Sequence, residues 1–266
     1  MRIVVCIKQV PSSGDVTVDP VTHNLVREKA GSMLNPSDYN AIEAALLLRE
    51  QLSESGSDCK VAAVTMGPPD AQEVLRTAMA MGADEACLLT DRQFAGGDTI
   101  ATATVLAAGI EKYGAYDLII AGAESSDGAT GQVGPMVAER LSIPHIAMVQ
   151  EMEAATDSLI AVKKMNGTRI KLKASMPALV TVRYGANEPR LATLRSRMAA
   201  KKKPIVTYTN EELGLPRSAI GAEGSPTVVT ESFRPEIVNT CEFMTGNPKE
   251  IARQMLALIE KERGNS

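Results

Sequence analysis

Short apolar segments alternate with longer segments of helical periodicity through the first 121 residues, and this alternation limits the possible folds most strongly. The apolar segments cover residues 3–7, 60–65, 86–90 and 117–121. Strands separated by helices of this length are joined by right-handed crossovers, which build a parallel sheet covered on both faces. The sequence therefore predicts a doubly wound α/β domain.

Helical signals lie between these predicted strands. The second predicted helix starts near Asp70, after two prolines, and ends at Gly82. A third is predicted over residues 99–110, behind Gly96-Gly97-Asp98. The first carries one apolar stripe at spacings of three and four residues, formed by Ala41, Ala44, Ala45, Leu48 and Leu52.

After Pro144 the pattern is that of antiparallel strands. Residues 158–165 and 168–175 flank Asn166-Gly167, the strongest two-residue signal for a hairpin. Apolar and polar residues alternate in the second segment, so one face is expected to be buried and the other exposed. With a further strand predicted over 178–183, this region is expected to extend the sheet.

The last third of the chain lacks the apolar content of a separate core. Residues 185–204 show no apolar periodicity, and a strand is predicted over 204–209. A turn-rich linker at 214–226 and an extended stretch at 227–232 precede a helix over 248–262 with an apolar side. This helix either folds back or packs on another chain. We divide the chain into an α/β domain, 1–206, and a C-terminal arm, 207–266.

Composition and missing motifs exclude several classes of function. The net charge of −4, with both signs interspersed, gives no reason to expect nucleic acid. No apolar run approaches the roughly 18 residues that span a membrane. The first strand follows Met1 without a leader, so we expect a cytoplasmic protein. Buried thiols are favoured over disulfides or a zinc site for the four cysteines, Cys6, Cys59, Cys87 and Cys241.

The chain also lacks the common sequence motifs of enzyme active sites. The two histidines, His23 and His145, have no metal-ligand spacing around them, and a structural role is favoured for both. The chain contains no GxSxG elbow, no P-loop and no GxGxxG after its first strand. We therefore expect neither a catalytic side chain nor a metal ion.

A glycine-rich segment, residues 122–135, follows the fourth predicted strand and leads into a helix predicted over 136–141. Ligands bind at the carboxyl ends of strands in open α/β sheets. The glycines allow close backbone approach, and the following helix N-terminus presents amide donors that suit a phosphate. An ordinary flexible loop is the alternative.

Two further loops follow neighbouring strands. Asn35-Pro36-Ser37-Asp38 precedes the first helix, where helix capping is the alternative role. Thr65-Met66-Gly67 ends the second strand. Because the carboxyl ends of parallel strands share one edge of a sheet, the three loops are expected to converge on one ligand.

Several motifs together resemble the β subunits of electron-transfer flavoproteins. They run in order from residue 1 to about 206: the opening Val4 to Pro11, the Asn35-Pro36-x-Asp38 segment, Asp127 to Pro135, Met176 to Val182, Asn187-Glu188-Pro189-Arg190, and Lys201 to Ile205. Val10-Pro11, the stretch from Asp19 to Arg27, and Gly128 with Gln132 to Pro135 favour the electron-bifurcating branch of anaerobes. Ala129 departs from the acid that this branch often carries.

The resemblance implies an adenine nucleotide α-hydrolase-like fold whose C-terminal arm packs on an α subunit. It implies bound FAD, with NADH as electron donor, in the bifurcating branch, or a structural AMP in an electron carrier. A stand-alone ATP-binding module is the rival reading from another class. Together with the loop analysis, the expected nucleotide-binding residues are Cys6, Asn35, Pro36, Ser37, Asp38, Thr65, Met66, Gly67, Glu124, Ser125, Ser126, Asp127, Gly128, Ala129, Thr130, Gly131, Gln132, Val133, Gly134 and Pro135.

The resemblance also implies partners. Residues 185–204 match the partner-recognition loop, and Leu194, between Thr193 and Arg195, falls where an apolar anchor for a dehydrogenase is expected. The alternative is a leucine folded under its own loop. Implied partners are the α subunit, an acyl-CoA or hydroxy-acid dehydrogenase that contains flavin, and a ferredoxin or flavodoxin. Lys164 stands where many members carry an acid beside the α-subunit flavin, so no role is transferred to it.

Overall fold

A nine-stranded sheet organises the first part of the chain, in the order β11-β10-β9-β12-β8-β1-β6-β7-β13. The computed structural model describes residues 1–12, 17–18, 25–26, 31–154, 157–230, 241 and 243–264. Seven neighbouring strands, from β9 to β13 in this order, pair in parallel. They are β1 (Arg2–Cys6), β6 (Lys60–Met66), β7 (Glu85–Leu89), β8 (Leu118–Gly122), β9 (His145–Ala154), β12 (Ala178–Val182) and β13 (Val206–Tyr208).

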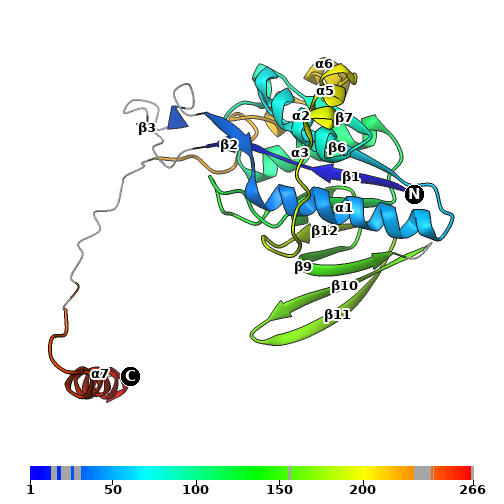
Figure 1. Ribbon diagram of the computed structural model, residues 1–266. Coiled ribbons are helices and arrows are strands. Elements are labelled where there is room, and N and C mark those ends of the chain that lie inside the picture. Colours follow the sequence, from blue (N-terminus) through cyan, green and yellow to red (C-terminus); the bar gives the residue numbers. More distant parts are fainter. Residues whose placement is uncertain are drawn as a thin grey trace. The chain divides into compact units, whose positions relative to one another are not determined.

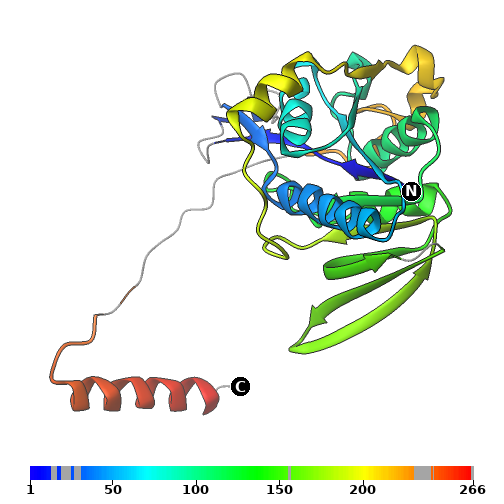
Figure 2. The same cartoon turned by 45° about the vertical axis from the view of Figure 1, so that its right-hand side comes forward.

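Helices cover both faces of this sheet (Figures 1 and 2). One buried cluster joins the sheet to α1 (Pro36–Glu54), α2 (Gln72–Met81) and α5 (Leu194–Lys202), and the other joins it to α3 (Thr99–Tyr113) and α4 (Val133–Arg140). In β1, Ile3 and Val5 belong to the first cluster and Val4 to the second, as the two-residue period of a strand requires. The predicted doubly wound α/β fold is confirmed.

The antiparallel addition is confirmed as well. Strands β10 (Ser158–Met165) and β11 (Thr168–Ser175) pair antiparallel, and β10 also pairs antiparallel with β9, so these strands extend one edge of the sheet (Figure 1). Asn166 and Gly167 have φ of 50° and 79°, the left-handed conformation that a two-residue hairpin of this sequence adopts. Residues of β11 that alternate in polarity alternate in exposure.

Helix starts differ slightly from prediction. A short 3₁₀ turn, η2 (Pro69–Ala71), precedes α2, and α4 begins three residues earlier than expected, at Val133. The larger difference is α5, which forms in a segment without apolar periodicity. Thr193 caps it by accepting a hydrogen bond from the Ser196 N–H, and Ala200 is its only buried residue among those described. A helix that buries one residue shows no apolar stripe.

The first compact unit ends at Thr230 rather than at residue 206. The chain beyond residue 206 still packs on the sheet, because β13 pairs with β7 and Ile220 is buried in the second cluster. Between them lie α6 (Asn210–Leu213) and η4 (Arg217–Ala219). The second unit, residues 231–266, contains the predicted helix as α7 (Pro248–Gly264).

Two small sheets and one turn complete the first unit. Strand β2 (Gln9–Pro11) pairs with β5 (Ser32–Leu34), β3 (Thr17–Val18) pairs with β4 (Leu25–Val26), and η3 (Arg92–Phe94) follows β7. His23, residues 231–232 of the predicted extended stretch, and most of the stretch from Asp19 to Arg27 lie outside the described residues. None of the described helices is both long and apolar enough to cross a membrane.

We predict that Gly109→Ala destabilises the protein, although alanine favours a helix by roughly 1 kcal/mol over glycine. A β-carbon at Gly109 in α3 would lie 2.3 Å from Leu89 Cδ1 in β7. Overpacking of this kind typically costs about 1–3 kcal/mol. Thermal unfolding of the single variant should show a lower midpoint, and adding Leu89→Ala should reduce the penalty of the glycine substitution. A higher midpoint for the single variant would contradict this packing argument.

Candidate functional site

The predicted loops meet where the chain changes direction across the sheet. From β1 the chain passes through α1 to β6 on one side, whereas β8, on the other side of β1, continues through α4 to β9. The carboxyl ends of β1 and β8 therefore flank the topological switch point, the usual place for a ligand in an open α/β sheet. Strands β8, β1 and β6 are neighbours, so the loops that follow them lie at one edge of the sheet. Their convergence on one ligand remains a prediction.

A buried carboxylate ties this switch point together. Asp38, in the first turn of α1, accepts hydrogen bonds from the Lys8 N–H (2.7 Å) and from Asn35 Nδ2 (3.0 Å), and also from the Gly122 N–H. The close approach requires glycine at 122, where a β-carbon would lie 2.1 Å from Asp38 Oδ1. One side chain thereby holds the loop after β1, the start of α1 and the end of β8.

Burial raises the pKa of Asp38 to about 7, because desolvation of the carboxylate outweighs its hydrogen bonds and the charge of Lys8. The same environment raises the pKa of the Cys6 thiol, at the end of β1, to about 12, first through burial and then through Asp38. Cys6 is therefore a protonated thiol at neutral pH and a poor nucleophile.

Asn35 joins α1 to the loop after β8. It occupies the N-cap position, but its side chain donates to the Glu124 carbonyl (2.9 Å) and accepts from the Ser126 N–H (3.0 Å). The capping alternative for this segment is therefore wrong for Asn35. Lys8 adds an ion pair with Asp127 (2.7 Å) and a hydrogen bond to Ser125 Oγ (3.3 Å), which fixes the first half of the glycine-rich segment.

The second half of that segment presents backbone groups. Ala129 and Gly131 have positive φ, and residues 128–130 are exposed. Gln132 is the N-cap of α4, but its side-chain oxygen accepts from Thr99 Oγ1 (3.0 Å). Among the described residues no side chain caps α4, so the N–H groups of Val133 and Gly134 remain available to an anion. Pro135 has no N–H to offer.

The loop after β6 contributes less than expected from side chains. Thr65 is fully buried, and its hydroxyl donates to the Ile7 carbonyl (2.7 Å). The Gly67 N–H donates to the Leu89 carbonyl (3.0 Å). Met66 is partly buried and, like Cys6, packs against the second core cluster. Contacts of Thr65, Met66 and Gly67 with a nucleotide remain predictions.

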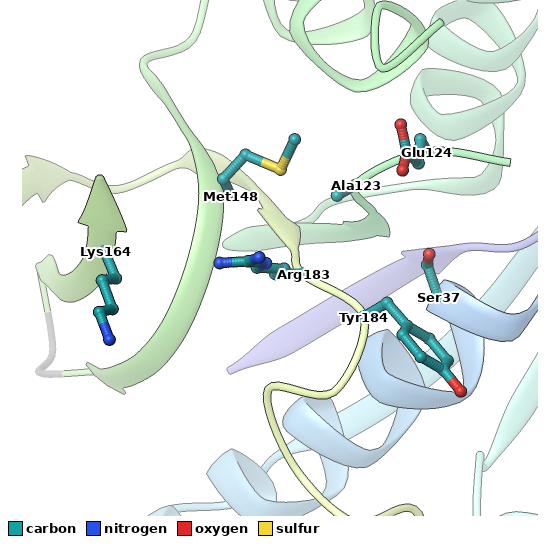
Figure 3. Close-up of a pocket in the computed structure, with 7 residues that line it drawn as sticks. All are labelled: Ser37, Ala123, Glu124, Met148, Lys164, Arg183 and Tyr184. Carbon is teal, nitrogen blue, oxygen red and sulfur yellow. The ribbon is translucent and has the colours of Figure 1, made fainter. Parts of the chain in front are cut away.

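A pocket of about 430 Å³ adjoins the switch point (Figure 3). Ser37, Ala123 and Glu124 line it from the α1 and β8 side, while Lys164 and Arg183 bring two cationic groups from β10 and the end of β12. Met148 and Tyr184 complete the described lining. Met148, Arg183 and Tyr184 stand in no motif, so no sequence signal predicts them as site residues.

Met148 in this pocket has an unusual backbone. Its φ of 61° is rare outside glycine, and its N–H donates to Thr181 Oγ1 (3.0 Å) where the pairing of β9 and β12 shifts register. Strained residues of this kind cluster at functional sites. The bulge places Met148 at the pocket, nearly half exposed.

The 185–204 segment lies along α1 and α2. Thr193 caps α5, and Leu194, the first residue of that helix, is 77% exposed. The alternative that Leu194 folds under its own loop is therefore wrong. Arg195 is exposed beside it. The docking roles of Thr193, Leu194 and Arg195 remain predictions.

Comparison with protein families defines the class. The model for the electron transfer flavoprotein domain matches residues 22–213, which covers most of the sheet and its helices. The chain therefore belongs to the electron transfer flavoprotein family.

Comparison with individual proteins defines the subunit, because the matches include β subunits over nearly the whole chain. It is 38% identical to the electron transfer flavoprotein subunit beta of Clostridium acetobutylicum over 98% of this chain and 99% of that protein. It is 39% identical to subunit CarD of the caffeyl-CoA reductase-Etf complex of Acetobacterium woodii, over 98% of both. Identity to the acryloyl-CoA reductase electron transfer subunit gamma of Anaerotignum propionicum is 37%, over 94% of both.

We predict a pH-dependent stability that Asp38→Asn removes. Because the pKa of Asp38 is higher folded than unfolded, the folded protein retains a proton that the unfolded chain loses. The contribution of Asp38 is therefore complete below about pH 4 and declines up to about pH 7, by up to about 1.4 kcal/mol per pH unit.

The difference in unfolding free energy between the two proteins isolates this group, since other titrations cancel. Measured by denaturant unfolding from pH 4 to 8, the wild-type protein should lose stability relative to Asp38→Asn as pH rises. A constant difference would mean that the three donors keep the carboxylate ionised throughout.

Proposed function

We propose that this chain binds FAD at the switch point and serves as the β subunit of a heterodimeric flavoprotein in NADH-dependent electron bifurcation. In this proposal one electron goes to a low-potential carrier such as ferredoxin or flavodoxin. The other reaches an acyl-CoA or hydroxy-acid dehydrogenase through the FAD of the α subunit. The observation that carries the proposal is the combination of a phosphate-compatible loop with an adjoining pocket.

The residues at the switch point suit a phosphate-bearing adenine nucleotide. The first N–H groups of α4 present donors to an anion, whereas the Ala129 N–H is already donated to the Ser125 carbonyl (2.8 Å) within the loop. Lys8 is mostly neutralised by Asp127, so the backbone rather than this ion would recognise the phosphates. Asp38 and Asn35 hold both loops in place.

The chain would contribute geometry rather than acid–base chemistry. When bound, FAD supplies the redox step, accepting hydride from NADH and passing electrons on singly. The pocket shares Ser37, Ala123 and Glu124 with the edge of the switch-point site, so a redox group seated in it would lie close to the nucleotide. Lys164 and Arg183 would favour negative charge there.

Relatives from acyl-CoA metabolism support a dehydrogenase or reductase as the partner. CarD belongs to a caffeyl-CoA reductase-Etf complex, and the Anaerotignum propionicum relative is a subunit associated with acryloyl-CoA reductase. We propose a homologous, cytoplasmic assembly in which the arm that contains α7 packs on the α subunit. Four exposed apolar residues on α7, Met255, Leu256, Leu258 and Ile259, suit such packing.

A non-bifurcating electron carrier with structural AMP is the second candidate. The same backbone donors would hold the phosphate of AMP, so these donors favour an adenine nucleotide without distinguishing FAD from AMP. A stand-alone ATP-binding module is less compatible with a chain that matches β subunits along its length.

We predict two FAD molecules in the assembled heterodimer. The chain would be co-expressed with an α subunit encoded beside it, and native mass spectrometry with identification of the released nucleotides would count the cofactors. One FAD and one AMP would instead establish the carrier. A monomer that retains ATP would contradict membership of a heterodimer.

We also predict that Leu194→Ala weakens docking of the dehydrogenase. Truncation of an apolar anchor that becomes buried in the complex typically costs about 1–2 kcal/mol of binding free energy. This cost corresponds to a rise in KM for the dehydrogenase of roughly five- to thirtyfold. The value of kcat and the cofactor content should not change. Val206→Ala, another exposed apolar residue, is the matched control. Equal KM values for the two variants would contradict the docking role.

A further inference from the structure

The 185–204 segment is attached to α1 by a buried ion pair. The Arg190 guanidinium donates through Nε (2.9 Å) and Nη2 (2.9 Å) to the Glu43 carboxylate, and the Arg190 N–H donates to Glu43 Oε2 (3.0 Å). The Glu43 side chain is 5% exposed and that of Arg190 33%. Arg190 Nη1 also donates to Glu50 (2.7 Å), which lowers the pKa of the Glu50 carboxyl.

A reciprocal amide pair adjoins the ion pair. Asn40 Nδ2 donates to the Asn187 carbonyl (2.8 Å), and Asn187 Nδ2 donates to the Asn40 carbonyl (3.0 Å). Asn40 Oδ1 accepts from the Gly185 N–H (3.2 Å). Asn40, Glu43 and Glu50 are three and seven residues apart, so they lie along one side of α1.

The other end of the segment is attached to α2 and to the loop between α2 and β7. Arg76 donates to the Ala200 carbonyl (2.7 Å) and to the Lys203 carbonyl, and Lys203 Nζ donates to the Ala83 carbonyl (3.1 Å). Between the two attachments Leu191 is 93% exposed, and Leu194 and Met198 are largely exposed. These apolar side chains are thus presented from a span held at both ends.

Stability alone is a weak reason for a buried ion pair. Desolvation of the ions offsets most of their attraction, and an apolar pair of similar volume is often as stable. A forked arginine–carboxylate pair instead defines a geometry, because two parallel hydrogen bonds fix distance and orientation. Here the pair fixes the position and orientation of Arg190, the residue directly before Leu191.

We propose that Asn40 and Glu43 on α1, with Asn187 and Arg190, form a clamp that pre-orders the 185–204 segment for docking. The four are positioning residues, and this inference rests on the proposed docking role of that segment. The clamp removes conformational freedom before binding, so the partner does not have to order the segment itself. Because Asp38 lies five residues before Glu43, about 7.5 Å along the helix, α1 carries both the switch point and the clamp.

Glu43→Gln is the primary test in the complete heterodimer. It removes the buried charge, while Arg190 retains solvent access and Glu50. Hydrogen exchange at the amides of residues 185–190 should accelerate at least about tenfold, with exchange in the middle of α1 unchanged. The KM for the dehydrogenase should rise about three- to tenfold at constant kcat and cofactor content, since ordering cost is added to binding.

Two further variants keep the test decisive. Asn187→Ala removes the amide pair without touching Glu43, and should speed exchange and raise KM in the same way. It therefore replaces the primary test if Glu43→Gln fails to fold. Glu54→Gln removes an exposed carboxylate from the last turn of the same helix and should change neither exchange nor KM.

The outcomes separate this inference from the docking proposal. If Leu194→Ala raises KM while the clamp variants speed exchange without raising KM, the clamp has no role in docking and the inference fails alone. If neither Leu194→Ala nor the clamp variants alter KM, the docking role fails and the inference fails with it. A rise in KM with faster exchange supports both.

Discussion

The Asp38 carboxylate is the interaction on which the arrangement of the switch point depends. It receives N–H groups from the loop after β1, from the start of α1 and from the end of β8, segments that are adjacent only in the folded chain. A buried carboxylate without hydrogen-bond partners would destabilise the fold. The three donors supply these partners, and the lack of a side chain at Gly122 leaves room for the carboxylate. The strand order leaves a crevice at the switch point. The Asp38 carboxylate holds the loop after β1 and the end of β8 at a fixed distance from each other.

Lys8, a cationic side chain at the switch point, is already paired within the protein. Lys8 pairs with Asp127, while Asp38 is buried among N–H donors, so the groups left for a ligand are mainly backbone amides at the start of α4. Backbone donors fixed by a helix and a glycine-rich loop are pre-organised for phosphate and carry no side-chain entropy. The adjoining pocket differs, since Lys164 and Arg183 give it cationic groups and Met148 a strained backbone.

Helix α1 connects the two surfaces on which function would depend. Its first turn forms the switch point, and its next turns hold the 185–204 segment through Asn40 and Glu43. The opposite side of the helix carries the apolar stripe that packs on the sheet. A single rigid element thus sets the position of a nucleotide loop and a partner-facing segment relative to the same sheet.

The sequence by itself determined most strands of the large sheet, most of the helices and the loops at the sheet edge, but it did not predict β9. Apolar periods of two and 3.6 residues, Asn166-Gly167 and the glycine-rich segment after β8 are local signals, and the family motifs specified which loops to consider. The helix α5 was missed because it buries only Ala200 among its described residues. Its signal was the Thr193 cap, which is weak without an apolar stripe.

Only the tertiary structure decided which polar side chains meet. Asn35 bonds to a carbonyl 89 residues away, and Glu43 bonds to an arginine 147 residues away. Neither pairing leaves a local pattern, because the partners are brought together by strand order and helix packing. Asp38, Lys8 and Arg190 have these partners only in the folded chain, and those partners decide what each charge does.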